Sequence, residues 1–257
     1  MELWIHVDMK CLAPTPDALA RDIAEWAAQG ATGVVFEWEN MFPYPGFEDA
    51  VRRDAYTPAE VGRILGCCKE HGLKAVPLVQ TFGHVEWCLS QARYAGLREF
   101  ADEPKQIRAC DGKSWDVLRA WVAALIEAHA DCPYIHLGAD EAWKLRDVDR
   151  PECSAKREGA SAVFLRHMKP LFDQVLAAGK RPIIWADMVL RHPEQMGDFP
   201  KEVVFCDWLY SQTSEYDAAV HGWDLGRIAA DTYEALPARA KELFGRYWRM
   251  DAQDFPA

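Results

Sequence analysis

Short apolar runs alternate along the chain with longer stretches of helical patterning, and this alternation is the feature that most constrains the fold. The six apolar runs are residues 3–7, 33–38, 74–79, 134–138, 182–185 and 203–208. The helical stretches cover about residues 16–29, 57–71, 114–130, 158–178 and 231–248. Repeated strand–helix units form a parallel sheet with right-handed crossovers. The pattern therefore predicts either a doubly wound sheet or most of a (β/α)8 barrel of the TIM type.

The residues at the ends of these runs favour the barrel. No glycine-rich phosphate-binding motif follows any run, so nucleotide binding in a doubly wound sheet lacks support. The runs end instead in acids, histidine and aromatic residues: Asp8, Glu37, Glu39, His84, Asp140, Glu141, Trp185, Asp187, Trp208 and Tyr210. Such residues at the carboxyl ends of several strands are typical of a barrel active site.

A complete barrel has eight strands, and the sequence contains six clear strand patterns. The last 45 or so residues contribute a polar stretch and one helical pattern. We therefore expect an α/β barrel that is incomplete at its C-terminus. Either strands seven and eight are present without a clear pattern, or they are missing, or the chain is a fragment. Since no repeat, low-complexity segment or clear linker is found, residues 1–257 are expected to form a single catalytic barrel domain.

The composition disfavours several classes of partner. The chain of 257 residues is 50% apolar and carries a net charge of −11, so it would repel nucleic acid and anionic membranes. Its 8 cysteines form no C-x-x-C pair, which indicates reduced thiols. No signal peptide is visible, and no apolar stretch reaches the roughly 20 residues of a membrane span. We expect a cytoplasmic protein without metal or cofactor, and the oligomeric state stays open.

The segment from His136 to Glu141 carries the strongest chemical signal, because it follows a strand and ends in two adjacent acids. Neighbouring carboxylates repel each other, so proteins that place them together usually give them different roles. An acid pair at the start of a helix is the simpler alternative. Side chains alternate along a strand, so Asp140 would point into the barrel mouth, and Glu141 would need a bend to reach the same space.

Two tryptophans and a histidine add to this signal. Trp185 and Trp208 each close an apolar run, and the apolar faces of sugar rings stack on indole. Core packing is the alternative for any single tryptophan, but two at one edge of a sheet, beside acids, favour a sugar site. His84 follows Gly83, which permits a tight turn, although a lone histidine in such a place is more often structural.

Several segments match a known pattern in the same order. Residues 37–44 are close to E-Y-E-D-M-F-P-Y, residues 77–84 are followed by Glu86, and residues 136–141 fit H-x-G-x-D-E. Weaker matches are residues 185–188 against W-D-D-M and residues 208–210 against W-D-Y. From Leu3 to about Tyr210 the chain thus resembles the family 20 glycoside hydrolases, the β-N-acetylhexosaminidases, and among them the hexosaminidase D type.

This resemblance implies a (β/α)8 barrel that releases terminal N-acetylglucosamine or N-acetylgalactosamine from β-linked glycans with retention. In such enzymes the substrate's own 2-acetamido oxygen is the nucleophile. Glu141 would protonate the leaving glycosidic oxygen and later act as base on the incoming water. Asp140 would accept a hydrogen bond from the acetamido N–H and stabilise the oxazolinium intermediate.

The resemblance also implies roles for residues around the acid pair. His84 and Glu39 would form a histidine–acid relay that orients Glu141 and helps raise its pKa. The acetamido pocket would be walled by Trp185 and Trp208.

Further contacts with the sugar are implied at other positions. Tyr210 would hydrogen-bond the acetamido carbonyl, and Asp187 would bind a sugar hydroxyl. His136 belongs to the substrate-binding set, because it shares a strand face with Asp140, and Gly138 would leave room for the sugar.

Some positions depart from the family pattern. Many members have an arginine after the first strand, where Asp8 or Lys10 would substitute here. Ala186 and Leu209 replace acids of the two weaker motifs. The late motifs of the family, including a tryptophan of strand eight, are not found.

Two alternatives stay open. The first is an inactive glycan-binding or truncated barrel of the same family, which the missing strands favour and the intact acid pair disfavours. The second is a metal-dependent barrel hydrolase that uses His6, Asp8, His84 and His136, although the family pattern uses none of these as ligands.

Overall fold

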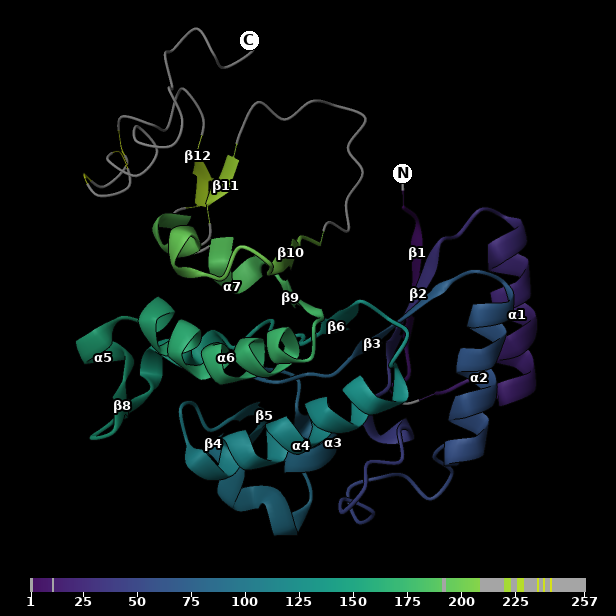
Figure 1. The fold of residues 1–257 in the computed structure, drawn as a ribbon. Coiled ribbons are helices and arrows are strands. Elements are labelled where there is room, and N and C mark those ends of the chain that lie inside the picture. Colours follow the sequence, from purple (N-terminus) through teal and green to yellow (C-terminus); the bar gives the residue numbers. More distant parts are fainter. Residues whose placement is uncertain are drawn as a thin grey trace, which may run out of the picture.

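The computed structural model describes residues 2–10, 12–190, 193–208, 220–222 and 226–228 together with residues 235, 238 and 241. A six-stranded parallel sheet forms its centre (Figure 1). Its strands are β1 (Trp4–Asp8), β2 (Gly33–Glu37), β3 (Lys74–Leu78), β6 (Tyr134–His136), β9 (Arg181–Trp185) and β10 (Val204–Cys206). All six predicted strands are thereby confirmed, with ends that differ by no more than two residues from the predicted ones.

The strands lie in the sheet in the order in which they occur in the chain. A doubly wound sheet reverses its strand order at one point, whereas a barrel adds each new strand on the same side. The described sheet contains no reversal, so it is the incomplete (β/α)8 barrel that the sequence predicts. Right-handed crossovers in one direction place the connecting helices on a single face of the sheet.

Four long helices make these crossovers: α1 (Pro16–Ala28), α2 (Pro58–Glu70), α4 (Gly112–Ala128) and α6 (Ala160–Ala177). Helices α1 and α2 pack side by side, as do α4 and α6 (Figure 1). Helix α2 begins with a capping box, since Thr57 accepts a hydrogen bond from the backbone N–H of Glu60 and Glu60 accepts one from that of Thr57. The helix predicted at 231–248 lies almost entirely outside the described residues.

Two antiparallel hairpins that the sequence pattern did not indicate leave the carboxyl edge of the sheet. One is β4 (Arg98–Phe100) with β5 (Glu103–Ile107), between β3 and α4. The other is β7 (Asp149–Arg150) with β8 (Cys153–Ser154), between β6 and α6. A third described pair joins β11 (Val220–Gly222) to β12 (Gly226–Ile228).

Short helical segments complete the loops of the described part. The α-helical ones are α3 (Glu86–Leu89), α5 (Ala155–Glu158) and α7 (Asp187–Leu190). The 3-10 segments are η1 (Glu39–Met41), η2 (Ala92–Leu97), η3 (Trp143–Asp147) and η4 (Pro193–Asp198). Most of them follow the carboxyl end of a strand, so this edge of the sheet carries the longer and more elaborate connections.

Several tryptophans belong to the core. Trp38 is fully buried and stacks on Phe36 with ring centroids 4.9 Å apart, while its Nε1 donates to Nε2 of His129 at 3.0 Å. Trp121 is fully buried and packs against Trp87 with ring centroids 4.6 Å apart. Core packing therefore accounts for these indoles, as sequence statistics suggest for most tryptophans.

Gly83 fixes the relative position of the segments that follow β3 and β6. A Cβ atom at this position would lie 2.1 Å from the backbone oxygen of Asp140 and 3.2 Å from the carbonyl carbon of Glu141. The φ angle of Gly83 is not positive. The glycine is thus needed for close backbone approach, and not for a left-handed backbone conformation.

We predict that Gly83→Ala lowers the free energy of unfolding by about 1–3 kcal/mol, because the methyl group forces two backbone segments apart. Urea denaturation measures the change. The matched control is Gly62→Ala, an exposed position in α2 where a Cβ meets nothing within 4 Å and where alanine is a better helix former by about 1 kcal/mol. Equal stability of the two variants would contradict the packing argument.

Candidate active site

A cleft of about 310 Å³ opens at the carboxyl edge of the sheet. It is lined by His6, Asp8, Lys10, Glu37, Gln80, His84, Asp140, Glu141, Trp185 and Trp208. These residues come from the ends of all six strands, although they are spread over some 200 positions of the sequence. The cleft is therefore a product of the barrel topology, which brings strand ends together.

Six of the ten residues predicted to form the catalytic and sugar-binding site line this cleft, namely Asp8, His84, Asp140, Glu141, Trp185 and Trp208. Three others, Glu39, His136 and Asp187, are almost completely buried next to it. Tyr210 lies outside the described residues.

The backbone bends sharply where β6 ends, and this bend brings both acids to the cleft. Gly138, Ala139 and Glu141 have φ angles of 61°, 70° and 49°, in the left-handed region. His84 and Glu39 share this conformation, with φ angles of 56° and 49°. Such angles cost free energy in residues other than glycine, and they concentrate at functional sites.

Gly138 does not leave space for a ligand, which corrects the prediction for this residue. A Cβ atom there would lie 2.0 Å from Oε1 of Gln80 and 3.1 Å from the Cα atom of Gln80. The Gln80 side chain fills the space, donates to Oε1 of Glu37 at 3.0 Å and accepts from the N–H of Ala139 at 3.3 Å. The glycine therefore serves the packing of the site's floor.

The two adjacent acids have different surroundings. Asp140 is the more buried, and burial raises the pKa of its carboxyl group to about 6, with Asp187 and Glu37 adding to the rise and His84 opposing it. Burial also acts on Glu141, but hydrogen bonds and charge from Lys105 and His84 outweigh it and lower the pKa of Glu141. The pair thus separates into one carboxyl group that holds its proton and one that is readily ionised.

Direct contacts account for this difference. Nε2 of His84 lies 3.1 Å from Oε2 of Glu141 and 3.4 Å from Oδ2 of Asp140. Nζ of Lys105 donates to the same Glu141 oxygen at 3.0 Å. The buried Oδ1 of Asp140 has no hydrogen-bond partner among the described residues.

The predicted relay from Glu39 through His84 to Glu141 is formed only in its second half: His84 contacts Glu141 at 3.1 Å, but no contact joins Glu39 to His84 in the described residues. The pKa of Glu141 is lowered by Lys105 and His84, which corrects the expectation that the relay raises it.

Within the described part of the chain, Glu39 lies 3.4 Å from Nζ of Lys10 and interacts with Glu37. Burial and the neighbouring acids Glu37 and Asp8 raise the pKa of Glu39, although Lys10 opposes the rise. The left-handed turn at Glu39 directs its side chain to the base of the cleft and thus to Lys10.

Glu37 is a buried carboxylate at the centre of the cleft floor, with 3% of its surface exposed. Burial alone would raise the pKa of Glu37, but hydrogen bonds from His6, Lys10 and Gln80 together with the charge of Lys10 hold it far below its usual value. His6 contacts Oε2 of Glu37 at 3.0 Å, and Lys10 donates to Oε1. Lys10 is in turn held protonated by Glu39 and Glu37.

His136 and Asp187 are buried beneath the cleft and contact the residues that line it. Nδ1 of His136 accepts from the N–H of Gly138 at 3.0 Å, and its ring lies 4.5 Å from that of Trp185. Burial, with the nearby His6, lowers the pKa of His136 to about 3. Oδ2 of Asp187 accepts from the backbone N–H of Glu141 at 3.0 Å. Asp187 therefore holds the loop that carries Glu141.

Sequence reasoning missed Lys105 and Gln80 and assigned no role to Glu37. Glu37 and Gln80 stand at strand ends inside the matched segments, and this position was the available signal. Lys105 lies on hairpin β4–β5, in a polar stretch without a distinctive pattern.

In the described residues, no group of three or more histidine, cysteine or acidic side chains is arranged to hold a metal ion. No described helix is long and apolar enough to span a bilayer.

An acidic, tryptophan-walled cleft on the carboxyl edge of a (β/α) barrel is characteristic of glycoside hydrolase catalytic domains. The family model for the catalytic domain of glycosyl hydrolase family 20 matches residues 24–232, and the chain belongs to this family.

Individual relatives agree with this assignment. Hexosaminidase D of Homo sapiens is 30% identical over 226 residues, which are 85% of this chain and 46% of that protein. Hexosaminidase D of Bos taurus is 31% identical over 195 residues, or 74% of this chain and 56% of that protein. The chain therefore spans about half the length of these curated relatives.

Solved structures show the same fold. The chitobiase of Flavobacterium johnsoniae aligns with a TM-score of 0.68 at 15% identity, over 82% of this chain and 34% of that one. A β-N-acetylhexosaminidase of Bacteroides fragilis aligns with a TM-score of 0.64 at 18% identity, over 80% and 45% of the two chains. The barrel predicted from the sequence is thereby confirmed.

We predict that Lys10→Met lowers the free energy of unfolding at neutral pH by about 1–3 kcal/mol, because two buried acids lose their cation. Loss of one partner of a buried pair costs roughly 3–5 kcal/mol, and the 35% exposure of Lys10 reduces this. Urea denaturation measures the effect. Lys69→Met is the control, since the Lys69–Asp131 pair is more than three-quarters exposed and worth less than about 1 kcal/mol. An equal loss of unfolding free energy in Lys10→Met and Lys69→Met would contradict the role of Lys10 as the cation that stabilises the buried acids.

Proposed function

We propose that this protein is an exo-acting retaining β-N-acetylhexosaminidase, which removes terminal N-acetylglucosamine or N-acetylgalactosamine through an oxazolinium intermediate. One observation carries the proposal: two adjacent acids face the same cleft in surroundings that shift their pKa values in opposite directions. Pairs of carboxyl groups with separated pKa values are how an active site assigns acid and base roles. Family membership supports the reaction type.

In the proposed reaction the acetamido carbonyl oxygen attacks the anomeric carbon as the glycosidic bond breaks. Glu141 gives its proton to the leaving oxygen, and Asp140 accepts a hydrogen bond from the acetamido N–H. A water molecule then attacks the anomeric carbon and gives a proton to Glu141. The oxazolinium ring opens, which restores the acetamido group of the released sugar. Two inversions give net retention, and Glu141 returns to its protonated form.

A single proton on the acid pair is sufficient for this sequence of steps. In the free protein this proton resides mainly on Asp140, since its pKa is about 6 and that of Glu141 is lowered. A sugar whose acetamido N–H donates to Asp140 favours the ionised form of that residue. Binding of the substrate therefore moves the proton to Glu141, where the reaction needs it.

The other cleft residues are proposed to bind the sugar ring. Trp185 and Trp208 line the cleft and would stack on the apolar faces of the ring and the acetamido methyl group. Asp8 and Lys10 line the same cleft and would bind ring hydroxyls. Tyr210 keeps the role that the resemblance implies, as a donor to the acetamido carbonyl.

We predict that Glu141→Gln and Asp140→Asn each lower kcat/KM on p-nitrophenyl N-acetylglucosaminide and galactosaminide by about 10²–10⁴-fold, the usual contribution of a general acid–base group. Asp173→Asn is the control, an exposed acid of α6 that pairs with Lys169. Full activity in Glu141→Gln would remove the proposed general acid. A folded wild-type protein that binds the free amino sugar without turnover would instead favour a glycan-binding barrel.

We predict that kcat/KM falls as the pH rises above about 6. The monoprotonated acid pair is the active form, and burial raises the pKa of Asp140 to about 6, so the last proton leaves the pair in this range. Activity also falls at low pH, where a second proton enters at the lowered pKa of Glu141. A pH series of initial rates measures both limbs, and activity that rises steadily from pH 6 to 8 would contradict this assignment.

A further inference from the structure

The carboxylate of Glu141 is held through one oxygen only. Within the described residues, both side-chain donors on this group, His84 Nε2 at 3.1 Å and Lys105 Nζ at 3.0 Å, contact Oε2. The backbone N–H of Glu141 is fixed separately by Asp187. Two donors on the same oxygen set the rotation of the carboxyl group, so Oε1 is the oxygen left to face a ligand.

Hairpin β4–β5 delivers Lys105 to this position. The carbonyl oxygen of Lys105 accepts from the N–H of Val85 at 3.0 Å, and the N–H of Ile107 donates to the carbonyl oxygen of Phe82 at 3.0 Å. These bonds fasten β5 to the segment that carries His84. The Lys105 side chain is 28% exposed, and Lys105 is not among the residues that line the cleft.

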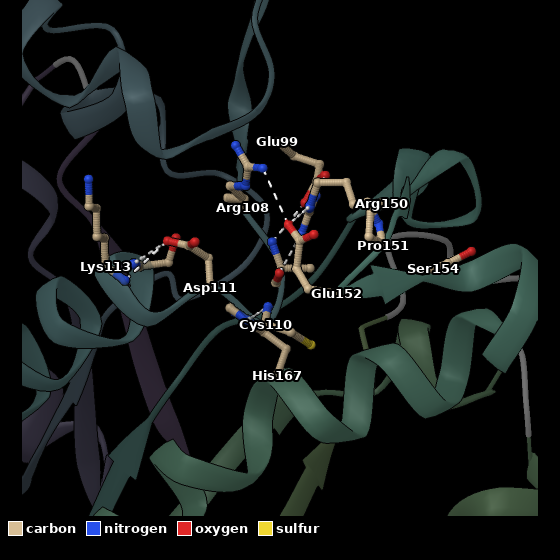
Figure 2. Close-up of polar contacts among 12 residues, drawn as sticks. Glu99, Arg108, Cys110, Asp111, Lys113, Arg150, Pro151, Glu152, Ser154 and His167 are labelled. Carbon is tan, nitrogen blue, oxygen red and sulfur yellow. Dashed lines mark hydrogen bonds and ion pairs between the residues drawn. The ribbon is translucent and has the colours of Figure 1, made fainter.

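A buried ion pair fastens the same hairpin to the second hairpin, β7–β8 (Figure 2). Arg150 of β7 binds Glu99 of β4, with 14% and 3% of the two side chains exposed. Arg150 also donates to the carbonyl oxygen of Ala109 at 2.7 Å, and Glu99 accepts from the N–H of Ala109 at 2.7 Å. This three-membered contact, the Glu99–Arg150 clamp, ties the segment that follows β3 to the segment that follows Glu141.

The contact of Lys105 with Oε2 suits the proposed role of Glu141 as a general acid. When a general acid gives up its proton, negative charge develops on its carboxyl group, and a fixed cation stabilises that charge without reorganisation. A cation on the non-reacting oxygen does so without occupying the oxygen that meets the substrate. Among the described residues, the other ionisable groups around Glu141 are His84, Asp140 and Asp187, of which only the histidine can supply a positive charge.

We propose that Lys105 is a positioning residue, held in place by the Glu99–Arg150 clamp, that fixes Glu141 through Oε2 and stabilises the carboxylate left after proton donation. The fixing of Glu141 stands on the contacts alone, whereas the stabilisation during the reaction rests on the proposed function.

The test is a pH titration of the carbon-13 signal of the Glu141 carboxyl group, assigned with the Glu141→Gln variant. A cation at 3.0 Å favours the ionised form, so Lys105→Met moves the titration to higher pH and Lys105→Arg restores it. The control is Lys144→Met, which removes a lysine that pairs with Glu103 of the same hairpin without reaching Glu141. An unmoved titration in Lys105→Met, or an equal shift in Lys144→Met, would overturn the proposal.

Enzyme kinetics supply the second readout. Lys105→Met lowers kcat by about 10- to 100-fold with KM little changed, the size of effect that a misplaced catalytic group produces. Its acidic pH limb moves up with the Glu141 titration, while the alkaline limb stays in place. A residue with a merely structural role would lower the rate and leave both limbs unmoved. If the wild-type protein has no activity and the titration still shifts, the proposed function fails and the positioning role of Lys105 stands.

The clamp is tested through Arg150→Met, with the same carbon-13 titration as readout. If the clamp holds Lys105, the Glu141 titration moves in the same direction as in Lys105→Met while the lysine itself is intact. A folded Arg150→Met protein with an unmoved titration would overturn the role of the clamp. If Arg150→Met does not fold, Glu99→Gln replaces it, since this change removes the charge and keeps the shape of the side chain.

Discussion

The close approach of the segments that follow β3 and β6 is the contact on which the site depends. The two strands pair in parallel, with Leu78 opposite His136, and therefore end at the same edge of the sheet. Beyond that edge the backbone of Asp140 comes so near to position 83 that only glycine fits there. This contact is what puts His84 within reach of both Asp140 and Glu141.

Each buried acid around the cleft has its own balance of burial and charge. Glu37 is surrounded by donors and stays ionised in spite of its burial, whereas Asp140 has no lysine or arginine partner among the described residues and holds its proton to about pH 6. Desolvation favours the neutral carboxyl group, and a nearby cation reverses this preference. The balance of burial, neighbouring acids and nearby donors therefore differs at each acid, and Glu39 keeps a raised pKa although Lys10 lies beside it.

Most of the fold follows from local sequence. Apolar runs predicted all six sheet strands, and the helical pattern at residues 57–71 predicted α2, which the threonine, proline and glutamate at residues 57–60 start locally. The hairpins escaped prediction because their strands are short and polar, and their stability comes from long-range pairs such as Glu99–Arg150. The role of Gly138 was predicted wrongly, because its neighbour Gln80 is 58 positions away and no local pattern indicates that its side chain fills the space.

The sequence by itself determined which residue types stand at the strand ends, and so the acid and tryptophan content of the cleft. This is possible because strand and helix periodicity is a local property of neighbouring residues. Only the tertiary structure decided which partner each acid has: Lys10 for Glu39, and Lys105 with His84 for Glu141. Electrostatic interactions depend on distance through space, and the loops that set these distances are joined by contacts between residues far apart in the chain.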